Sequence, residues 1–171
     1  MDRILIVGSP GSGKTTLGRI MAEKLGIPLV HLDKLFWREG WVEAPRDEFD
    51  ALLTAELKKD KWIIDGNFSR TLNMRLQRAD TVIFLDYPSP VCLLRVLKRV
   101  AKNYGITRPD MGEGCPEKLD LEFLSYVWSF RSKERPVIVE RLSAAKNVEL
   151  ITIRNKREYK EFMSRLKYKG P

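Results

Sequence analysis

The sequence predicts a single α/β domain built around a mainly parallel β-sheet. Five short apolar segments rich in β-branched residues alternate with stretches of helical spacing along the 171-residue chain. No internal repeat or linker divides the chain, so one domain should span residues 1–171. The first apolar segment runs directly into a glycine-rich turn and then a helix, which places that turn at the carboxyl end of a strand.

The expected strands are short, mainly apolar segments, and the first of them, RILIV, has the pattern of a strand covered on both faces of a sheet. The runs lie at residues 3–7, 28–32, 62–64, 81–85 and 148–153. The expected helices lie at residues 15–25, 45–60, 91–102, 119–142 and 156–166. Gly26 should end the first helix, and Pro136 can interrupt the fourth because proline donates no backbone hydrogen bond. Residues 104–116, rich in glycine and proline, should form a loop.

The composition excludes several classes of protein. The chain is 43% hydrophobic and 32% charged, and no apolar run reaches the roughly 18 residues of a membrane span, so we expect a cytoplasmic protein without a membrane partner. Cys92 and Cys115 are too few for a disulfide framework or a four-thiolate zinc site. The single histidine, His31, excludes a two-histidine metal site. Any chemistry must therefore come from Lys, Arg, Asp, Ser and Thr side chains and from the backbone.

The net charge is +8, and its excess lies in the second half of the chain. Residues 91–171 carry eighteen basic and ten acidic side chains. Such a surplus suits either an anionic small ligand or a nucleic-acid backbone. Charge alone does not choose between them.

A full match to the phosphate-binding pattern G-x-x-x-x-G-K-[ST] follows the first expected strand and opens the first helix. In such loops, glycines bring backbone N–H groups up to phosphate oxygens, and the helix N-terminus adds partial positive charge. Lys14 would bridge the β- and γ-phosphates of ATP, and the Thr15 hydroxyl would hold Mg²⁺. The residues expected to bind the cofactor are Gly8, Ser9, Pro10, Gly11, Ser12, Gly13, Lys14, Thr15 and Thr16.

Three of the expected strands are followed by a carboxylate, at Asp33, Asp65 and Asp86. In open parallel sheets, ligands bind at the carboxyl ends of the strands. Asp65 is the preferred candidate for the Mg²⁺ shell, because Gly66 leaves space beside it. Asp33 is better placed as a substrate ligand or as a base that accepts a hydroxyl proton. Asp86 could serve either role or cap the end of its strand.

Several segments together resemble a known family, the adenylate-kinase-like P-loop phosphotransferases. They are the phosphate loop, IIDGN (63–67), VIFLDYP (82–88) and LLRVLKR (93–99). A closer resemblance, to the FlaR-related branch often labelled DNA topology modulation proteins, runs over essentially the whole chain. It is carried by HLDKLFWREGW (31–41), WIIDGNF (62–68), TRPDMGEGCPEKLDLEF (107–123) and RSKERP (131–136).

The resemblance implies a three-layer α/β/α P-loop NTPase fold. Its five-stranded parallel sheet would have the order 2-3-1-4-5, and a small mobile lid would span about residues 104–118. Arg95 and Arg99, four residues apart on one helix, would neutralise the transferred phosphate. Candidates for arginines that close over the nucleotide are Arg108, Arg131 and Arg135.

Two departures from the adenylate kinase pattern concern the phosphate acceptor. The usual Asp-Gly-aromatic-Pro-Arg segment is replaced by DGNFSR (65–70), so Arg70 would take the arginine's role with a shift of one position. The insert that normally binds a nucleoside monophosphate is a short tryptophan-containing segment in which Trp37 and Trp41 flank Arg38. Those rings could line an acceptor pocket or simply pack over the core. Trp62 and Trp128 fit core positions.

These observations favour an ATP-dependent phosphotransferase that passes the γ-phosphate of Mg-ATP to a small acceptor near Asp33, Trp37 and Arg70. A kinase for a non-nucleotide hydroxyl group is the nearest variant. The alternative is a nucleotide-binding regulator of DNA topology, although no helix-turn-helix or zinc-finger pattern is present. A nucleotide switch without transfer activity is a third possibility. The expected partners are a nucleotide and a small-molecule acceptor, for a monomer or dimer.

Overall fold

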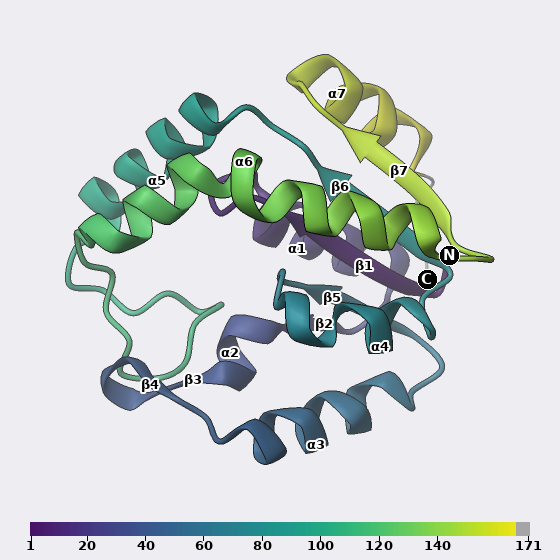
Figure 1. The fold of residues 1–171 in the computed structure, drawn as a ribbon, viewed down its shortest axis with the longest axis horizontal. Helices are drawn as coiled ribbons and strands as arrows, with labels where there is room; N and C mark the ends of the chain where they lie inside the picture. Colours follow the sequence, from purple (N-terminus) through teal and green to yellow (C-terminus); the bar gives the residue numbers. More distant parts are fainter. Residues whose placement is uncertain (167–171) are drawn as a thin grey trace.

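The computed structural model describes residues 1–166 and shows a five-stranded sheet between two layers of helices (Figure 1). All strand pairs within this sheet are parallel. The strands are β1 (Arg3–Gly8), β2 (Leu29–His31), β5 (Trp62–Asp65), β6 (Thr81–Leu85) and β7 (Glu149–Ile153). The predicted α/β fold with its parallel sheet is therefore confirmed.

The strand order along the sheet is β2-β5-β1-β6-β7. Numbered among themselves in chain order, these five strands follow the expected order 2-3-1-4-5. The labels differ in detail because two further strands, β3 (Trp37–Arg38) and β4 (Val42–Glu43), come between β2 and β5 in the chain. These two form a separate antiparallel pair outside the main sheet. With β1 at the centre, the turn that follows it lies in the middle of the sheet's carboxyl edge.

Seven α-helices lie within the described residues. They are α1 (Lys14–Leu25), α2 (Leu32–Phe36), α3 (Arg46–Leu57), α4 (Leu72–Leu76), α5 (Ser89–Asn103), α6 (Leu121–Ala144) and α7 (Lys156–Arg165). Short 3₁₀ turns, η1 (Glu39–Trp41) and η2 (Ser69–Thr71), precede β4 and α4. The sequence pattern does not predict α2 or α4, because five residues are too few to show a helical period.

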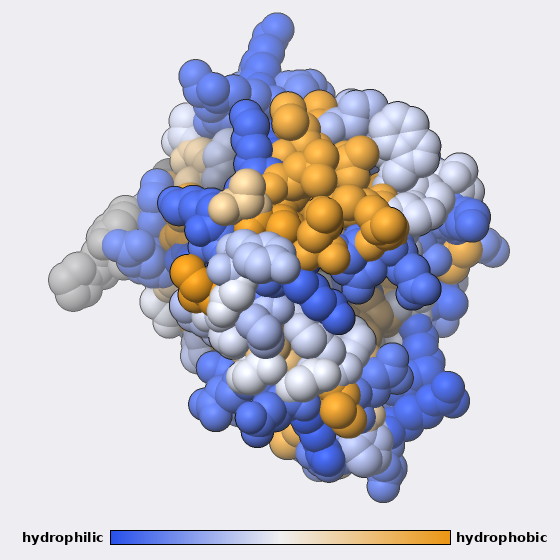
Figure 2. All heavy atoms as spheres, turned by 90° about the vertical axis from the view of Figure 1, so that its left-hand side faces the viewer, coloured by the Kyte–Doolittle hydropathy of each residue, from blue (hydrophilic) through white to orange (hydrophobic). Residues whose placement is uncertain are grey.

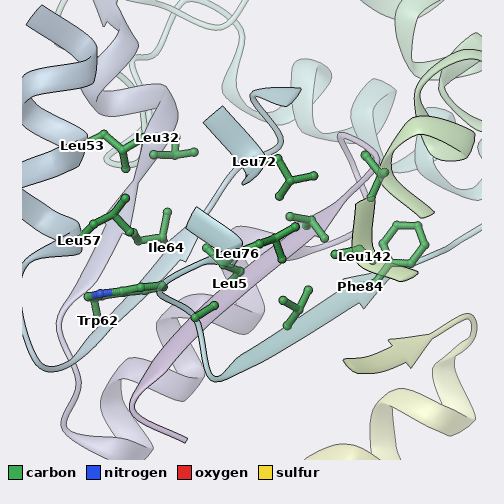
Figure 3. Close-up of a cluster of buried hydrophobic side chains, with 14 of the residues drawn as sticks. Leu5, Leu32, Leu53, Leu57, Trp62, Ile64, Leu72, Leu76, Phe84 and Leu142 are labelled. Atoms are coloured by element: carbon green, nitrogen blue, oxygen red, sulfur yellow. The ribbon is translucent and has the colours of Figure 1, made fainter. Parts of the chain in front are cut away.

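The core consists of two hydrophobic clusters, one on each face of the sheet. Leu5 and Val7 of β1 belong to one cluster, which α3, α4 and the second half of α6 cover (Figure 3). Ile4 and Ile6 belong to the other, which α1, α5 and α7 cover. Alternate residues of a strand point to opposite faces, so a continuous apolar run fills both clusters. This packing fixes the sheet's carboxyl edge, where the candidate site lies.

Helix α6 continues through Pro136 without the interruption that the sequence allows. Phe130 lies before the proline, Ile138 and Leu142 lie after it, and all three pack into the same core cluster. Contacts on both sides of Pro136 hold the two halves of the helix in line, at the cost of one backbone hydrogen bond.

One of the two tryptophans expected in the core is exposed. Trp62 is fully buried, as predicted, but the prediction for Trp128 is wrong, since 58% of its surface is exposed. Figure 2 shows apolar side chains gathered on the side of the molecule where α5 and the start of α6 lie. Val91, Leu94 and Leu97 of α5 are exposed large hydrophobic residues. Within residues 1–166, none of the helices combines the length and apolar character that a bilayer crossing requires.

Candidate functional site

A cavity of about 1200 Å³ opens beside the phosphate loop, at the carboxyl edge of the sheet. The phosphate loop, the start of α1, α5 and the 104–118 segment all contribute lining residues. Further lining residues come from α2, β3, η1, the residues that follow β5, and α6. Segments far apart in the sequence therefore meet around one space, as expected at this edge of a parallel sheet.

The phosphate loop needs its glycines for two reasons. Gly8, Gly11 and Gly13 have φ values of 148°, 78° and 102°, a region that other residues rarely adopt. A Cβ atom on Gly8 or Gly11 would also lie 2.4 Å from a backbone carbonyl oxygen. At Gly13, by contrast, an added Cβ would meet nothing within 4 Å, because this residue borders the cavity. The buried Ser12 hydroxyl has no hydrogen-bond partner among the described residues, which fits a loop shaped for a ligand.

The Lys14 ammonium group lies over the loop. It donates hydrogen bonds to the carbonyl oxygens of Gly8 at 2.8 Å and Ser9 at 3.0 Å. Burial lowers the pKa of Lys14, while the nearby Asp65 and Asp33 carboxylates act in the opposite direction. The side chain is thus held at the cavity wall with its donors available to a phosphate oxygen.

Asp65 and Thr15 both line the cavity and provide oxygen donors of the kind that Mg²⁺ prefers. Asp65 is buried, and its Oδ1 lies 2.9 Å from Nδ1 of His31. No group of three metal-ligating side chains occurs within residues 1–166. A single carboxylate and a hydroxyl suit an ion that keeps several waters and shares phosphate oxygens, so the residues present fit Mg²⁺ bound with a nucleotide.

Asp33 lies in the first turn of α2 rather than at the end of a strand, and it faces the same cavity. Burial raises its pKa, and the neighbouring Lys14 ammonium partly offsets this effect. No side chain in the described part of the structure makes a hydrogen bond or an ion pair with the Asp33 carboxylate. A half-buried carboxylate of this kind can accept a hydroxyl proton or bind a hydroxyl group.

Arg95 and Arg99 both reach the cavity from α5, as their spacing predicts. Arg95 donates to the Ser12 carbonyl oxygen at 3.1 Å, and its guanidinium lies over the Tyr87 ring. Arg99 donates to Glu117 at 2.9 Å. The two arginines therefore lie beside the phosphate loop, one of them already paired with a carboxylate.

A network of ion pairs ties the 104–118 segment to the body of the protein. Arg108 pairs with Asp110 at 2.6 Å and with Glu117 at 2.7 Å. Asp110 also pairs with Arg19 of α1 at 3.2 Å, and Glu117 with Arg99 of α5 at 2.9 Å. Two buried carboxylates thus hold three guanidinium groups from three parts of the chain at the mouth of the cavity.

The same segment packs against the β3–β4 hairpin. Gly40 donates its N–H to the Gly114 carbonyl oxygen at 3.0 Å, and the Trp41 ring N–H donates to Pro116 at 3.2 Å. A Cβ on Gly112 would lie 1.8 Å from the Trp37 carbonyl oxygen. The two inserts therefore meet over the cavity, and both Trp37 and Trp41 line it.

Three arginines proposed for the site lie elsewhere. Arg135 binds Asp86 through two hydrogen bonds, of 2.7 and 2.8 Å, and Arg131 lies 3.7 Å from the same carboxylate. Arg70 forms a two-point pair with Asp50 of α3. None of the three lines the cavity. Each of these guanidinium groups has a carboxylate within reach that the linear sequence does not show. The roles expected of the three arginines stay predictions.

Several polar residues of the cavity escape the sequence analysis, among them Asn67, Ser69, Tyr126 and Glu134. Asn67 accepts a hydrogen bond from the Gly8 N–H at 3.0 Å, and so joins the segment after β5 to the phosphate loop. Ser69 donates to Glu134 at 3.3 Å. Burial, with nearby Glu134, raises the pKa of Tyr126 to about 12. The only signal for Tyr126 and Glu134 is their eight-residue spacing, which places them on one face of α6.

Arg75 of α4 holds the backbone of the segment that follows β5, which lines the cavity. Its guanidinium is completely buried and donates to the carbonyl oxygens of Gly66 at 2.9 Å, Phe68 at 3.0 Å, and Asn67. Burial lowers the pKa of Arg75 to about 9, which leaves it charged at neutral pH. This side chain fixes the turn after β5, including Phe68, whose φ is 37°. No sequence pattern distinguishes Arg75 from an ordinary surface arginine.

A glycine-rich loop between the central strand and the first helix, with a lysine folded over it, defines a P-loop phosphate-binding protein of the α/β class. The comparisons with known proteins agree with this class. Residues 4–120 match the model of the family described as AAA domain, and the chain belongs to that family.

Curated relatives include proteins named as kinases. The chain is 31% identical over 123 residues to a Pyrococcus abyssi protein called "Putative adenylate kinase", covering 68% of this chain and 63% of the relative. It is 31% identical over 114 residues to shikimate kinase from Caldicellulosiruptor saccharolyticus, covering 57% of this chain and 65% of the relative. The matches thus span less than two thirds of the length of these relatives.

Solved structures of the same fold include two shikimate kinases. The enzyme from Acinetobacter baumannii, in complex with shikimate, aligns with a TM-score of 0.58 at 18% identity over 96% of this chain and 92% of its own. The enzyme from Bacteroides thetaiotaomicron aligns with a TM-score of 0.56 at 20% identity over 96% and 95%. At these identities the likeness shows the fold alone.

Proposed function

We propose that this protein is an ATP-dependent phosphotransferase that transfers the γ-phosphate of Mg-ATP to a hydroxyl group of a small acceptor. One observation carries the proposal: the phosphate loop with Lys14 and the carboxylate of Asp33 border the same cavity. Such a transfer requires at least a binding site for the phosphate donor and, beside it, a group that accepts the hydroxyl proton.

The nucleotide would lie along the phosphate loop with its triphosphate against the backbone N–H groups of residues 8–16. Lys14 would exchange one of its carbonyl partners for a phosphate oxygen, while Arg95 and Arg99 would approach from α5. Thr15 and Asp65 would hold Mg²⁺, which neutralises phosphate charge when it is bound. Phosphoryl transfer depends mainly on such positioning and charge neutralisation.

The acceptor would enter beside Asp33 and Trp37. Asp33 would orient the acceptor hydroxyl and accept its proton as the oxygen attacks the γ-phosphorus. Trp37 provides a ring on which an apolar or planar face of the acceptor can rest. The names of the relatives support a kinase reaction. The β3–β4 hairpin beside the proposed acceptor position is short, which favours a small acceptor.

The 104–118 segment would act as the lid of this site. It already covers the cavity, and its contacts with α1 and α5 are ion pairs that water or phosphate can replace. When a triphosphate binds, Arg99 and Arg108 would turn from Glu117 and Asp110 toward phosphate oxygens. A lid closed over the bound nucleotide would keep water from the γ-phosphate, which favours transfer to the acceptor over hydrolysis of ATP.

The test is transfer of radiolabelled γ-phosphate from Mg-ATP to small hydroxyl compounds, compared between the wild-type protein and Lys14→Ala. Lys58→Ala, a change at an exposed position after α3, is the matched control. We expect transfer in the wild type and in the control, and none in Lys14→Ala, whose melting temperature should stay close to that of the wild type. Undiminished transfer by Lys14→Ala would contradict the proposal.

A further inference from the structure

His31 lies directly beside Asp65, the carboxylate proposed above to hold Mg²⁺. The two residues are register partners on the parallel strands β2 and β5, so their side chains lie on the same face of the sheet. Nδ1 of His31 lies 2.9 Å from Oδ1 of Asp65, a distance typical of a hydrogen bond. A carboxylate accepts hydrogen bonds and does not donate them, so Nδ1 carries the proton and is the donor.

This contact is enclosed, and one of its two members faces the cavity. The side chains of His31 and Asp65 are 13% and 6% exposed. Asp65 lines the cavity, whereas His31 does not. The imidazole can therefore act on a bound nucleotide or its metal ion only through the Asp65 carboxylate.

Close packing holds the two segments together. The residues that follow His31 and Asp65 are Leu32 and Gly66, and a Cβ atom on Gly66 would lie 2.8 Å from the Leu32 Cβ. The relative position of the imidazole and the carboxylate is thus set by two neighbouring strands. Functional groups held by strands keep their geometry more precisely than groups held by loops.

The Lys14 ammonium group does not pair with Asp65, although the two charges influence each other. Burial lowers the pKa of Lys14, and Asp65 is the strongest of the carboxylates that oppose this effect. Lys14 nevertheless donates to the carbonyl oxygens of Gly8 and Ser9, and within residues 1–166 no ion pair joins it to Asp65. In the same part of the chain, His31 is the only hydrogen-bond partner of the Asp65 carboxylate, so Oδ2 has none.

We propose that His31 is a positioning residue for the Mg²⁺ site, whose Nδ1–H holds Oδ1 of Asp65 and thereby leaves Oδ2 for the ion or one of its waters. This inference rests on the Mg-ATP-dependent function proposed above and adds a residue outside the cavity to it. Without the imidazole, the carboxylate could turn and pair with Lys14, which would take both groups from the nucleotide. Hydrogen-bonded partners behind metal ligands typically contribute about 10–100-fold to metal affinity.

Four substitutions separate this hydrogen bond from other effects of the side chain. His31→Asn keeps an N–H donor at the same number of bonds from the backbone as Nδ1, whereas His31→Leu keeps an apolar side chain and removes the donor. Asp65→Asn removes the charge of the carboxylate itself. Lys34→Ala, at an exposed position of α2 that does not line the cavity, is the matched control.

The experiment measures binding rather than turnover. ATP is titrated by calorimetry with Mg²⁺ and with EDTA, and Mn²⁺ binding to the protein–ADP complex is followed by electron paramagnetic resonance. We expect His31→Leu to weaken Mn²⁺ binding by at least about tenfold and to leave ATP binding in EDTA within about twofold of the wild type. His31→Asn and Lys34→Ala should bind Mn²⁺ within about threefold of the wild type, since each retains a donor to Asp65.

A double substitution tests whether His31 acts through the carboxylate. Combined with Asp65→Asn, His31→Leu should cause no further loss of Mn²⁺ affinity, because the two residues belong to one interaction. Circular dichroism and the melting temperature establish that each variant is folded. If His31→Leu does not fold, His31→Gln, whose amide lies one bond further from the backbone, takes its place with the same expectations.

The outcomes separate this inference from the proposed function. Mn²⁺ affinity equal to that of the wild type in folded His31→Leu would overturn the inference and leave the phosphotransferase function standing. Equal losses of ATP affinity with Mg²⁺ and with EDTA would also overturn it, because His31 would then support the whole loop. Absence of ATP binding to the wild type, with or without the metal ion, would overturn the proposed function itself.

Discussion

Replacing Arg75 with methionine should destabilise the protein by about 3 kcal/mol. The guanidinium is fully buried and donates to three backbone carbonyl oxygens, those of Gly66, Asn67 and Phe68. Backbone acceptors cannot be removed by mutation, so methionine leaves all three without their donor, at about 1–3 kcal/mol each. The desolvation cost of burying a charged group disappears at the same time and returns part of this loss.

The assay is urea and thermal unfolding followed by circular dichroism. For a chain of this size, each kcal/mol lowers Tm by about 2–4 °C, so a fall of about 6–12 °C is expected. Arg78→Met, an exposed position just after α4, should change stability by less than about 0.5 kcal/mol. If Arg75→Met is as stable as the control, the three carbonyl oxygens have other donors and the reasoning is refuted.

Two further predictions concern the cavity. Asp33→Asn should lower phosphate transfer by at least about 100-fold without preventing ATP binding. In the wild type the rate of phosphate transfer should rise as pH rises through the raised pKa of Asp33. A transfer rate that is the same in Asp33→Asn as in the wild type would argue against Asp33 as the proton acceptor. Because the folded protein holds that proton more tightly than the unfolded chain, Asp33 reduces stability as pH rises from its ordinary pKa to the raised one. Asp33→Asn should then be more stable than the wild type at neutral pH. Glu117→Gln leaves Arg99 without a paired carboxylate and Arg108 with Asp110 alone. Mg-ATP should therefore raise the Tm of this variant more than it raises the Tm of the exposed control, Glu113→Gln. Equal shifts would count against the exchange of Glu117 for phosphate as the partner of these arginines.

The fold is largely predictable from this sequence because its strongest patterns are local. Apolar runs indicate the five strands of the sheet. The glycines of residues 8–13 indicate the phosphate loop, because the loop requires positive φ angles at these positions. The short elements α2 and α4 escape prediction, because five residues show no period. Trp128 is misplaced because helical spacing alone does not show that its side of α6 faces solvent.

The candidate site is predictable only where its residues are close in the sequence. Most of the phosphate loop lines one cavity together with Asp33, Asp65 and the Arg95–Arg99 pair, while the roles of these residues stay predictions. Arg70 and Arg135 do not, since each is captured by a carboxylate 20 or 49 residues away. Glu134 joins the site only through the packing of α6. The closer resemblance to the FlaR-related branch stays a prediction, as do the cytoplasmic location and the oligomeric state.

Isothermal titration calorimetry with Mg-ATP tests the central claim most directly, because binding of a nucleoside triphosphate at the loop does not depend on the identity of the acceptor. The wild-type protein should bind one Mg-ATP, and Lys14→Ala should lose at least about tenfold in affinity through the loss of a charge-assisted hydrogen bond. Absence of any heat of binding to the wild type at millimolar Mg-ATP would contradict the account.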